Sequence, residues 1–95
     1  MKILLIGYGK MGKTIEAIAL TRGHEIVGKI DVGDTLSNFT QPADVAIEFT
    51  QPEAVVGNLK SCFDKEIPVV CGTTGWLKQQ QEVENYCREK NGTLL

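Results

Sequence analysis

The segment KILLIGYGKMG, residues 2–12, constrains the fold more than any other part of the chain. Its first half, Lys2 to Ile6, is an apolar run with the length and β-branched content of a strand buried on both faces. Three glycines in G-x-G-x-x-G spacing follow, and apolar residues then recur at helical intervals from Lys10 to Arg22. The segment therefore predicts a central parallel strand, a tight turn and a crossover helix.

Such a turn directs bare backbone N–H groups and the positive end of a helix dipole toward one point, where a pyrophosphate can bind. Gly7 permits the tight turn, Gly9 lets a phosphate approach the backbone, and Gly12 lets helix and strand pack closely. Asp31 ends the next predicted strand, about 20 positions later, where a carboxylate binds ribose hydroxyls. This context favours a dinucleotide ligand over a purely structural role for the glycines.

Asp31 also bears on the choice of cofactor. A carboxylate there accepts hydrogen bonds from a 2′-hydroxyl and repels a 2′-phosphate, and the next residue is Val32 rather than an arginine. We therefore expect NADH to be favoured modestly over NADPH. Lys10 and Lys13 lie near the predicted helix start, where they could offer positive charge to a phosphate, although Lys13 is more typical of a solvated helix surface.

Size and composition limit the alternatives. Ninety-five residues, 42% of them hydrophobic, suffice for one domain with a modest core. A net charge of -2 argues against a nucleic-acid partner, and the apolar runs are too short for a membrane span or a signal peptide, so we expect a cytoplasmic protein. The spacing of Cys62, Cys71 and Cys87 predicts reduced thiols rather than disulfides or a zinc site.

The rest of the chain alternates between strand and helix patterns. Strands are predicted at His24–Ile30, Asp44–Phe49 and Ile67–Cys71, helices from Pro52 to Phe63 and from Leu77 to Lys90, and the start of a further strand at Thr93–Leu95. The stretch from Val32 to Ala43 has no sustained period and is read as a connection with at most one helical turn. This order predicts an α/β fold, a Rossmann-like doubly wound parallel sheet.

Ligands of such sheets bind beyond the carboxyl ends of the strands. Four predicted loops meet there: Gly7–Gly12, Asp31–Gly33, Glu48–Pro52 and Gly72–Gly75. The two hydroxyls of the GTTG loop, and Phe49 with Thr50, are suited to contact a nicotinamide ring. Ordinary helix caps formed by these threonines, and a core position for Phe49, are the alternatives.

No catalytic constellation is visible. His24 begins the second predicted strand, where we expect a surface or edge residue without a catalytic role. Glu48, Glu53 and Asp64 show no pairing with a nucleophile and no metal-loop spacing. Trp76 either covers one side of the site or packs against its own helix.

Three segments together resemble the N-terminal, cofactor-binding domain of dihydrodipicolinate reductase, also called 4-hydroxy-tetrahydrodipicolinate reductase. They are GYGKMGK at Gly7–Lys13, IEFTQPEAV at Ile47–Val55 and VVCGTTGW at Val69–Trp76. The resemblance implies hydride transfer from NADH or NADPH to a cyclic dicarboxylate in lysine and diaminopimelate biosynthesis. The cofactor-binding residues that it implies, together with the glycine pattern, are Gly7, Tyr8, Gly9, Lys10, Met11, Gly12, Asp31, Phe49, Thr50, Gly72, Thr73 and Thr74.

The chain departs from the family in two ways. Its glycine loop is one residue shorter than the common G-x-x-G-x-M-G, which affects the contacts of Tyr8 and Lys10. The catalytic and substrate-binding groups implied by the family lie in a second domain that would follow Leu95, and the family homotetramer assembles through that domain. We therefore expect residues 1–95 to form a single NAD(P)-binding domain, a truncated reductase or an excised piece, that binds cofactor without efficient turnover.

Two other readings remain open at this point. One is the nucleotide domain of another amino-acid dehydrogenase, such as diaminopimelate or homoserine dehydrogenase. The other is a non-catalytic, dimeric nucleotide-sensing module, which shares the glycine pattern and the later acidic residue but is not expected to carry the GTTG loop.

Overall fold

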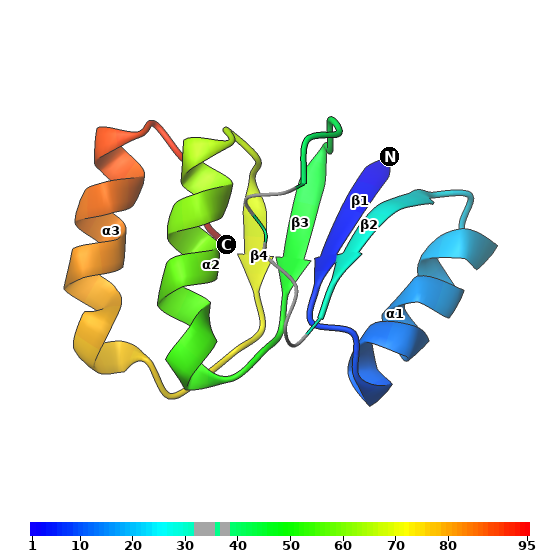
Figure 1. The fold of residues 1–95 in the computed structure, drawn as a ribbon, viewed down its shortest axis with the longest axis horizontal. Coiled ribbons are helices and arrows are strands. Elements are labelled where there is room, and N and C mark those ends of the chain that lie inside the picture. Colours follow the sequence, from blue (N-terminus) through cyan, green and yellow to red (C-terminus); the bar gives the residue numbers. More distant parts are fainter. Residues whose placement is uncertain (32–35, 37–38) are drawn as a thin grey trace.

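The computed structural model describes residues 1–31, 36 and 39–95 of the chain. It contains one sheet of parallel strands in the order β2-β1-β3-β4, with β1 in the interior as predicted (Figure 1). The strands are β1 (Lys2–Ile6), β2 (Glu25–Ile30), β3 (Val45–Glu48) and β4 (Val69–Cys71). The helices are α1 (Lys10–Thr21), α2 (Pro52–Asp64), the short 3₁₀ helix η2 (Leu77–Gln79) and α3 (Gln80–Glu89). The predicted Rossmann-like doubly wound fold is confirmed.

Alternating side chains of the strands build a core on each face of the sheet. On one face Leu4 and Ile6 pack with Leu59, Phe63 and other buried residues of β3, β4, α2 and α3. On the other face Ile3 and Leu5 pack with Ala19 of α1. The interior strand β1 therefore needs apolar residues at successive positions, which explains the continuous apolar run of the sequence.

Several boundaries differ from the prediction by one or two residues. β2, β3 and β4 are shorter than predicted, and Pro68 lies just outside β4, where its carbonyl accepts a hydrogen bond from the Ala46 amide at 2.8 Å. The predicted helix Leu77–Lys90 begins with the 3₁₀ turn η2 before α3 follows. Most of the predicted connection Val32–Ala43 lies outside the described residues, although Leu36 is described and belongs to the core.

The last residues continue the sheet as predicted. The Cys71 amide donates to the carbonyl of Leu95 at 3.0 Å, and the Val69 amide donates to the carbonyl of Thr93 at 2.9 Å. Val69 and Leu94 form a parallel bridge. Residues 93–95 thus lie beside β4 and pair with it through this single isolated bridge.

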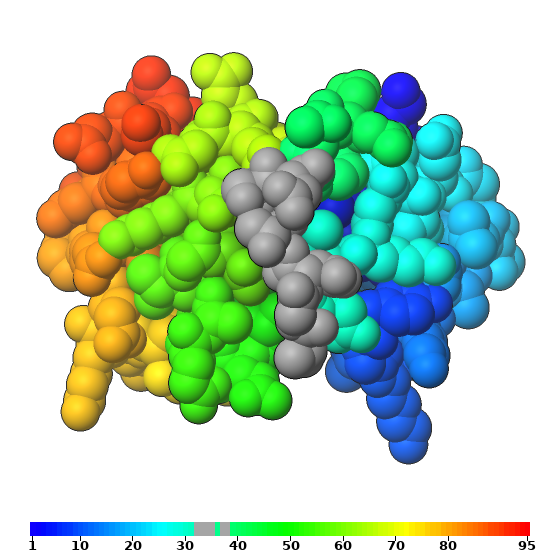
Figure 2. Space-filling view, in the orientation of Figure 1, coloured from blue at the N-terminus to red at the C-terminus, as the bar shows by residue number. Residues whose placement is uncertain are grey.

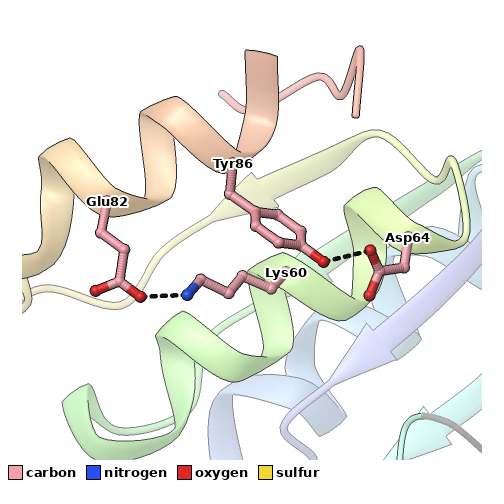
Figure 3. Close-up of polar contacts among 4 residues, drawn as sticks. All are labelled: Lys60, Asp64, Glu82 and Tyr86. Atoms are coloured by element: carbon pink, nitrogen blue, oxygen red, sulfur yellow. Dashed lines mark hydrogen bonds and ion pairs between the residues drawn. The ribbon is translucent and has the colours of Figure 1, made fainter. Parts of the chain in front are cut away.

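A polar contact cluster joins α2 to α3 on the surface (Figure 3). The Tyr86 hydroxyl donates to Asp64 Oδ1 at 2.6 Å, and Lys60 pairs with Glu82. The Tyr86 ring also lies 6.4 Å from that of the core residue Phe63. These contacts hold α3 in register along α2, so the position of the helix that follows the loop after β4 is fixed.

Within the part of the chain that the structure describes, no helix combines the length and apolar character needed to cross a bilayer.

Candidate functional site

The carboxyl ends of the parallel strands lie along one edge of the molecule. In Figure 1 the arrowheads point to the lower edge, where β1, β3 and β4 lead into α1, α2 and η2. Figure 2 shows the same edge from outside: the blue start of α1, the green start of α2 and the yellow segment leading toward α3 form its lower margin. Three of the four predicted loops therefore meet at one edge, whereas Val32 and Gly33 of the fourth lie outside the described residues.

The turn after β1 has the geometry that the glycine pattern predicts. Gly7 has φ +103°, a left-handed conformation that a side chain rarely adopts. Its amide donates to the carbonyl of Ile30 at 2.6 Å, which joins the turn to the end of β2. A Cβ atom at Gly7 would lie 2.5 Å from the carbonyl oxygen of Phe49. The turn is thus packed between the ends of β2 and β3, and only glycine fits there.

Gly12 and Gly9 have opposite surroundings. A Cβ atom at Gly12 would lie 2.8 Å from the Gly7 carbonyl oxygen and 3.2 Å from the ring of Phe49. A Cβ atom at Gly9 would meet no protein atom within 4 Å. Gly12 therefore allows the close helix-to-strand packing that we predicted, while Gly9 presents bare backbone to open space, where a ligand can approach.

The amino terminus of α1 follows directly. Gly9 is its N-cap and has no side chain to bond the first amides, and no acidic residue stands in the first turn. The positive end of the helix dipole is therefore not neutralised by its own sequence. Lys10 and Met11 are exposed at this end. The arrangement is suited to an anionic group.

Tyr8 points back onto the protein. Its hydroxyl donates to Glu16 Oε1 at 2.5 Å, and Lys29, which pairs with Glu16 at 2.7 Å, lies 4.7 Å from its ring centroid. The bond to Glu16 raises the pKa of Tyr8, and the bond from Lys29 lowers the pKa of Glu16. Because its hydroxyl is engaged within the chain, we expect Tyr8 to offer a ligand its backbone rather than its phenol.

Asp31 directly follows the carboxyl end of β2 and is exposed. The hydrogen bond from the Gly7 amide to Ile30 places its backbone beside the glycine turn. The predicted pair of features, a glycine turn and a carboxylate at the next strand end, is therefore adjacent in space.

Glu48, for which the sequence indicated no catalytic pairing, is the most informative side chain of this edge. It is fully buried at the carboxyl end of β3. Its Oε1 accepts from the Thr73 hydroxyl at 2.6 Å and from Cys71 Sγ at 3.7 Å. Its Oε2 accepts from the Thr50 hydroxyl and from Asn58 Nδ2, the latter at 3.2 Å. One carboxylate thus joins β3, β4 and α2.

This network changes the expectation for the threonines. The Thr50 and Thr73 hydroxyls donate to Glu48, so we expect a ligand to meet other groups of these two residues, while the contact of the exposed Thr74 hydroxyl with a ligand stays a prediction. Neither threonine caps a helix: Gln51 is the N-cap of α2 and Trp76 that of η2, each without a side-chain cap bond. The two hydroxyls serve to join the loops instead.

One signal in the sequence pointed to this network. A strand of a doubly covered parallel sheet is apolar throughout, so a glutamate at its end requires buried donors. Glu48 stands in such a strand, DVAIEF, beside Thr50 and 25 residues before the GTTG hydroxyl that it binds.

The GTTG loop is fixed by other bonds as well. The Gly72 amide donates to the Glu48 carbonyl at 2.6 Å, and Trp76 Nε1 donates to the Thr73 carbonyl at 2.8 Å. Trp76 is half-buried and packs against the core, whereas Gly72 and Thr74 are exposed. Phe49 is half-buried in the cluster under α1 and touches the position of Gly12.

Other titratable groups lie elsewhere. His24 precedes β2 at the opposite edge of the sheet, and Asp64 takes part in the contact between α2 and α3. The three cysteines are free thiols, and the residues described here contain no group of three side chains able to hold a metal ion. A surface hollow lined by Glu66–Pro68 and Lys90–Thr93 lies beside the amino-terminal end of β4, away from the strand ends described above.

Solved structures confirm the fold. A homoserine dehydrogenase from Thermoplasma acidophilum superposes with a TM-score of 0.72 at 17% identity, covering 99% of this chain and 42% of that one. A protein described as a putative homoserine dehydrogenase, from Archaeoglobus fulgidus, gives a TM-score of 0.71 at 14% identity over 100% of this chain and 41% of that one. At such identities the likeness is one of fold alone.

Sequence comparisons are more specific. A 4-hydroxy-tetrahydrodipicolinate reductase from Christiangramia forsetii is 42% identical, covering 100% of this chain and 40% of the relative. The protein of the same description from Staphylococcus carnosus is 44% identical over 79% of this chain and 34% of the relative. This chain therefore spans about two fifths or less of these relatives. The family model described as "Dihydrodipicolinate reductase, N-terminus" matches residues 1–94. The chain belongs to the dihydrodipicolinate reductase family and corresponds to its amino-terminal part.

Proposed function

We propose that the chain is the nicotinamide dinucleotide-binding part of a 4-hydroxy-tetrahydrodipicolinate reductase. The observation that carries this proposal is the turn after β1, where Gly9 leaves open space beside an uncapped helix terminus. The family membership of residues 1–94 supports it independently. The pyrophosphate would lie against the first turn of α1, and the adenosine ribose would lie toward Asp31 at the end of β2.

The cofactor supplies the hydride in such a reaction, and the protein supplies binding, orientation and electrostatics. In this chain the backbone of Gly7–Gly12 would bind the diphosphate, and the exposed residues Gly72 and Thr74 would face the other half of the dinucleotide. We propose that NADH binds more tightly than NADPH, because the carboxylate of Asp31 repels a 2′-phosphate. Binding of the dicarboxylate acceptor and delivery of a proton need further groups, so we expect cofactor binding without efficient turnover from residues 1–95.

The test is calorimetric titration with NADH and NADPH. Gly9→Val is the sharpest variant, because the protein itself has no atom within 4 Å of the added Cβ. It should fold normally yet lose at least tenfold in affinity for both cofactors, since the side chain occupies the space of the diphosphate. Asp31→Ala should weaken NADH more than NADPH. The matched control is Asp44→Ala, which removes an exposed carboxylate at the opposite edge of the sheet.

Retention of full affinity by Gly9→Val would reject the assigned diphosphate position. An equal response of NADH and NADPH to Asp31→Ala would reject the ribose contact. Failure of the unaltered chain to bind either cofactor would reject the proposed function as a whole.

A further inference from the structure

The topology determines where the second half of a dinucleotide would lie. If the diphosphate binds the turn after β1 and the adenosine ribose lies toward β2, the sheet order β2-β1-β3-β4 leaves the ends of β3 and β4 for the nicotinamide half. The groups at those ends are the loops 49–51 and 72–75. The side chain beneath both loops is that of Glu48.

Glu48 is a buried acceptor saturated by donors. The Thr73 hydroxyl donates to Oε1, and the Thr50 hydroxyl and the Asn58 amide donate to Oε2. The single thiol hydrogen of Cys71 is shared between Oε1 at 3.7 Å and the Thr73 carbonyl oxygen at 3.6 Å. In its bonds with these groups the Glu48 side chain is the acceptor. Among the described residues no lysine, arginine or histidine forms an ion pair with it. Such a group is costly to bury, and these four neutral donors are its compensation.

The same bonds belong to a short chain of hydrogen bonds that connects the two loops. The Thr50 amide donates to Thr73 Oγ1 at 2.8 Å, and the Thr73 hydroxyl donates onward to Glu48 at 2.6 Å. Because Glu48 takes the hydroxyl hydrogen, a lone pair of Thr73 Oγ1 is left facing the Thr50 amide. The carboxylate thereby sets the distance and the relative direction of the two loops.

We propose that Glu48 is a positioning residue for the nicotinamide half of the dinucleotide. It holds the loops 49–51 and 72–75 in the arrangement that receives this half. Glu48 itself is fully buried beneath these loops and does not touch the ligand in this proposal. The inference rests on the proposed function, because it requires a dinucleotide along this edge. It predicts that Glu48 affects one half of the ligand and leaves the other half unaffected.

The experiment compares NADH with ADP-ribose, which keeps the adenosine and diphosphate but lacks the nicotinamide. In Glu48→Gln one carboxylate oxygen becomes an NH₂ group that faces two donors, so buried donors lose their acceptor. We expect affinity for NADH to fall about tenfold or more, and affinity for ADP-ribose to change less than about twofold. Glu25→Gln is the matched control, since it alters an exposed strand glutamate at the opposite edge.

Asn58→Ala provides a second variant in case Glu48→Gln fails to fold. It removes one of the four donors from the surface of α2 and should weaken NADH selectively but less strongly. Asn85→Ala, at an exposed position of α3, is its control. Circular dichroism melting of each variant verifies that the chain is folded before titration.

The outcomes separate the two proposals. If the unaltered chain binds neither NADH nor ADP-ribose, the proposed function fails and this inference with it. If it binds both, but the folded variants weaken both ligands equally or neither of them, only the positioning role is overturned. The role is also overturned if the unaltered chain binds NADH no more tightly than ADP-ribose.

Discussion

Replacing Gly12 by alanine tests the packing of the glycine turn most directly. The residue lies in the first turn of α1, and its added Cβ would lie 2.8 Å from the Gly7 carbonyl oxygen, a backbone atom, and 3.2 Å from the Phe49 ring. Alanine gains at most about 1 kcal/mol of helix propensity over glycine. Overpacking against a backbone atom costs about 1–3 kcal/mol, because the turn itself must move. The gain therefore offsets at most about 1 kcal/mol of this cost, and the net effect should be a loss of up to about 2 kcal/mol of unfolding free energy.

Gly57→Ala is the matched control. Gly57 lies inside α2, is exposed, and a Cβ there would meet nothing within 4 Å. It should therefore show the propensity gain alone, about 0.5–1 kcal/mol of added stability. Urea denaturation followed by circular dichroism measures both values. The two variants should differ by the overpacking cost of about 1–3 kcal/mol, so their thermal midpoints should differ by more than about 4 °C.

The same pair of variants separates stability from binding. Gly12→Ala displaces the Gly7 carbonyl and hence the turn that we propose binds the diphosphate, so its affinity for NADH should fall, while Gly57→Ala should keep it. If Gly12→Ala stabilised the chain as Gly57→Ala does, the close contact between α1 and the turn would not exist, and the reasoning from glycine packing would be refuted.

Further predictions concern three side chains. The bond to Asp64 raises the pKa of Tyr86. The folded state therefore keeps this proton to a higher pH than the unfolded state does, and the unfolding free energy should decline as the pH rises above about 10. Urea titrations should show a weaker decline for Tyr86→Phe. The bond from Lys29 lowers the pKa of Glu16. Glu16 therefore stabilises the fold above the ordinary carboxyl pKa range, and this stabilisation is lost as the pH falls below about 4. Lys29→Met should weaken this loss of unfolding free energy at acid pH, and an unchanged loss would exclude the ion pair. Burial raises the pKa of Cys62 to about 12. Iodoacetamide at neutral pH should therefore alkylate Cys62 far more slowly than the other two thiols in the folded chain, and should alkylate it readily in urea. Rapid labelling of Cys62 in the folded chain, measured by peptide mass spectrometry, would contradict its burial.

The order of elements and the location of the glycine turn could be predicted from the residues alone. These features depend on local patterns: a continuous apolar run, glycines at set offsets and a 3.6-residue period. Each pattern lies within about ten consecutive residues, so it can be recognised in the sequence. The apolar run Lys2–Ile6 became the interior strand β1, and Gly7 adopts the left-handed conformation that only glycine tolerates readily. The family resemblance also came from contiguous segments, and the comparisons confirm it.

Only the tertiary structure revealed the network around Glu48 and the contact between Tyr86 and Asp64. Their partners are 25 and 22 residues apart in sequence, and no local period relates them. The partners of Glu48 become identifiable only when β4 and α2 bring Thr73 and Asn58 against it. The same structure shows that the Thr73 hydroxyl donates inward, to Glu48. The strand DVAIEF indicates that Glu48 needs buried donors. Those donors come from segments that only the folded chain brings together, so their identity could not be predicted from the order of residues.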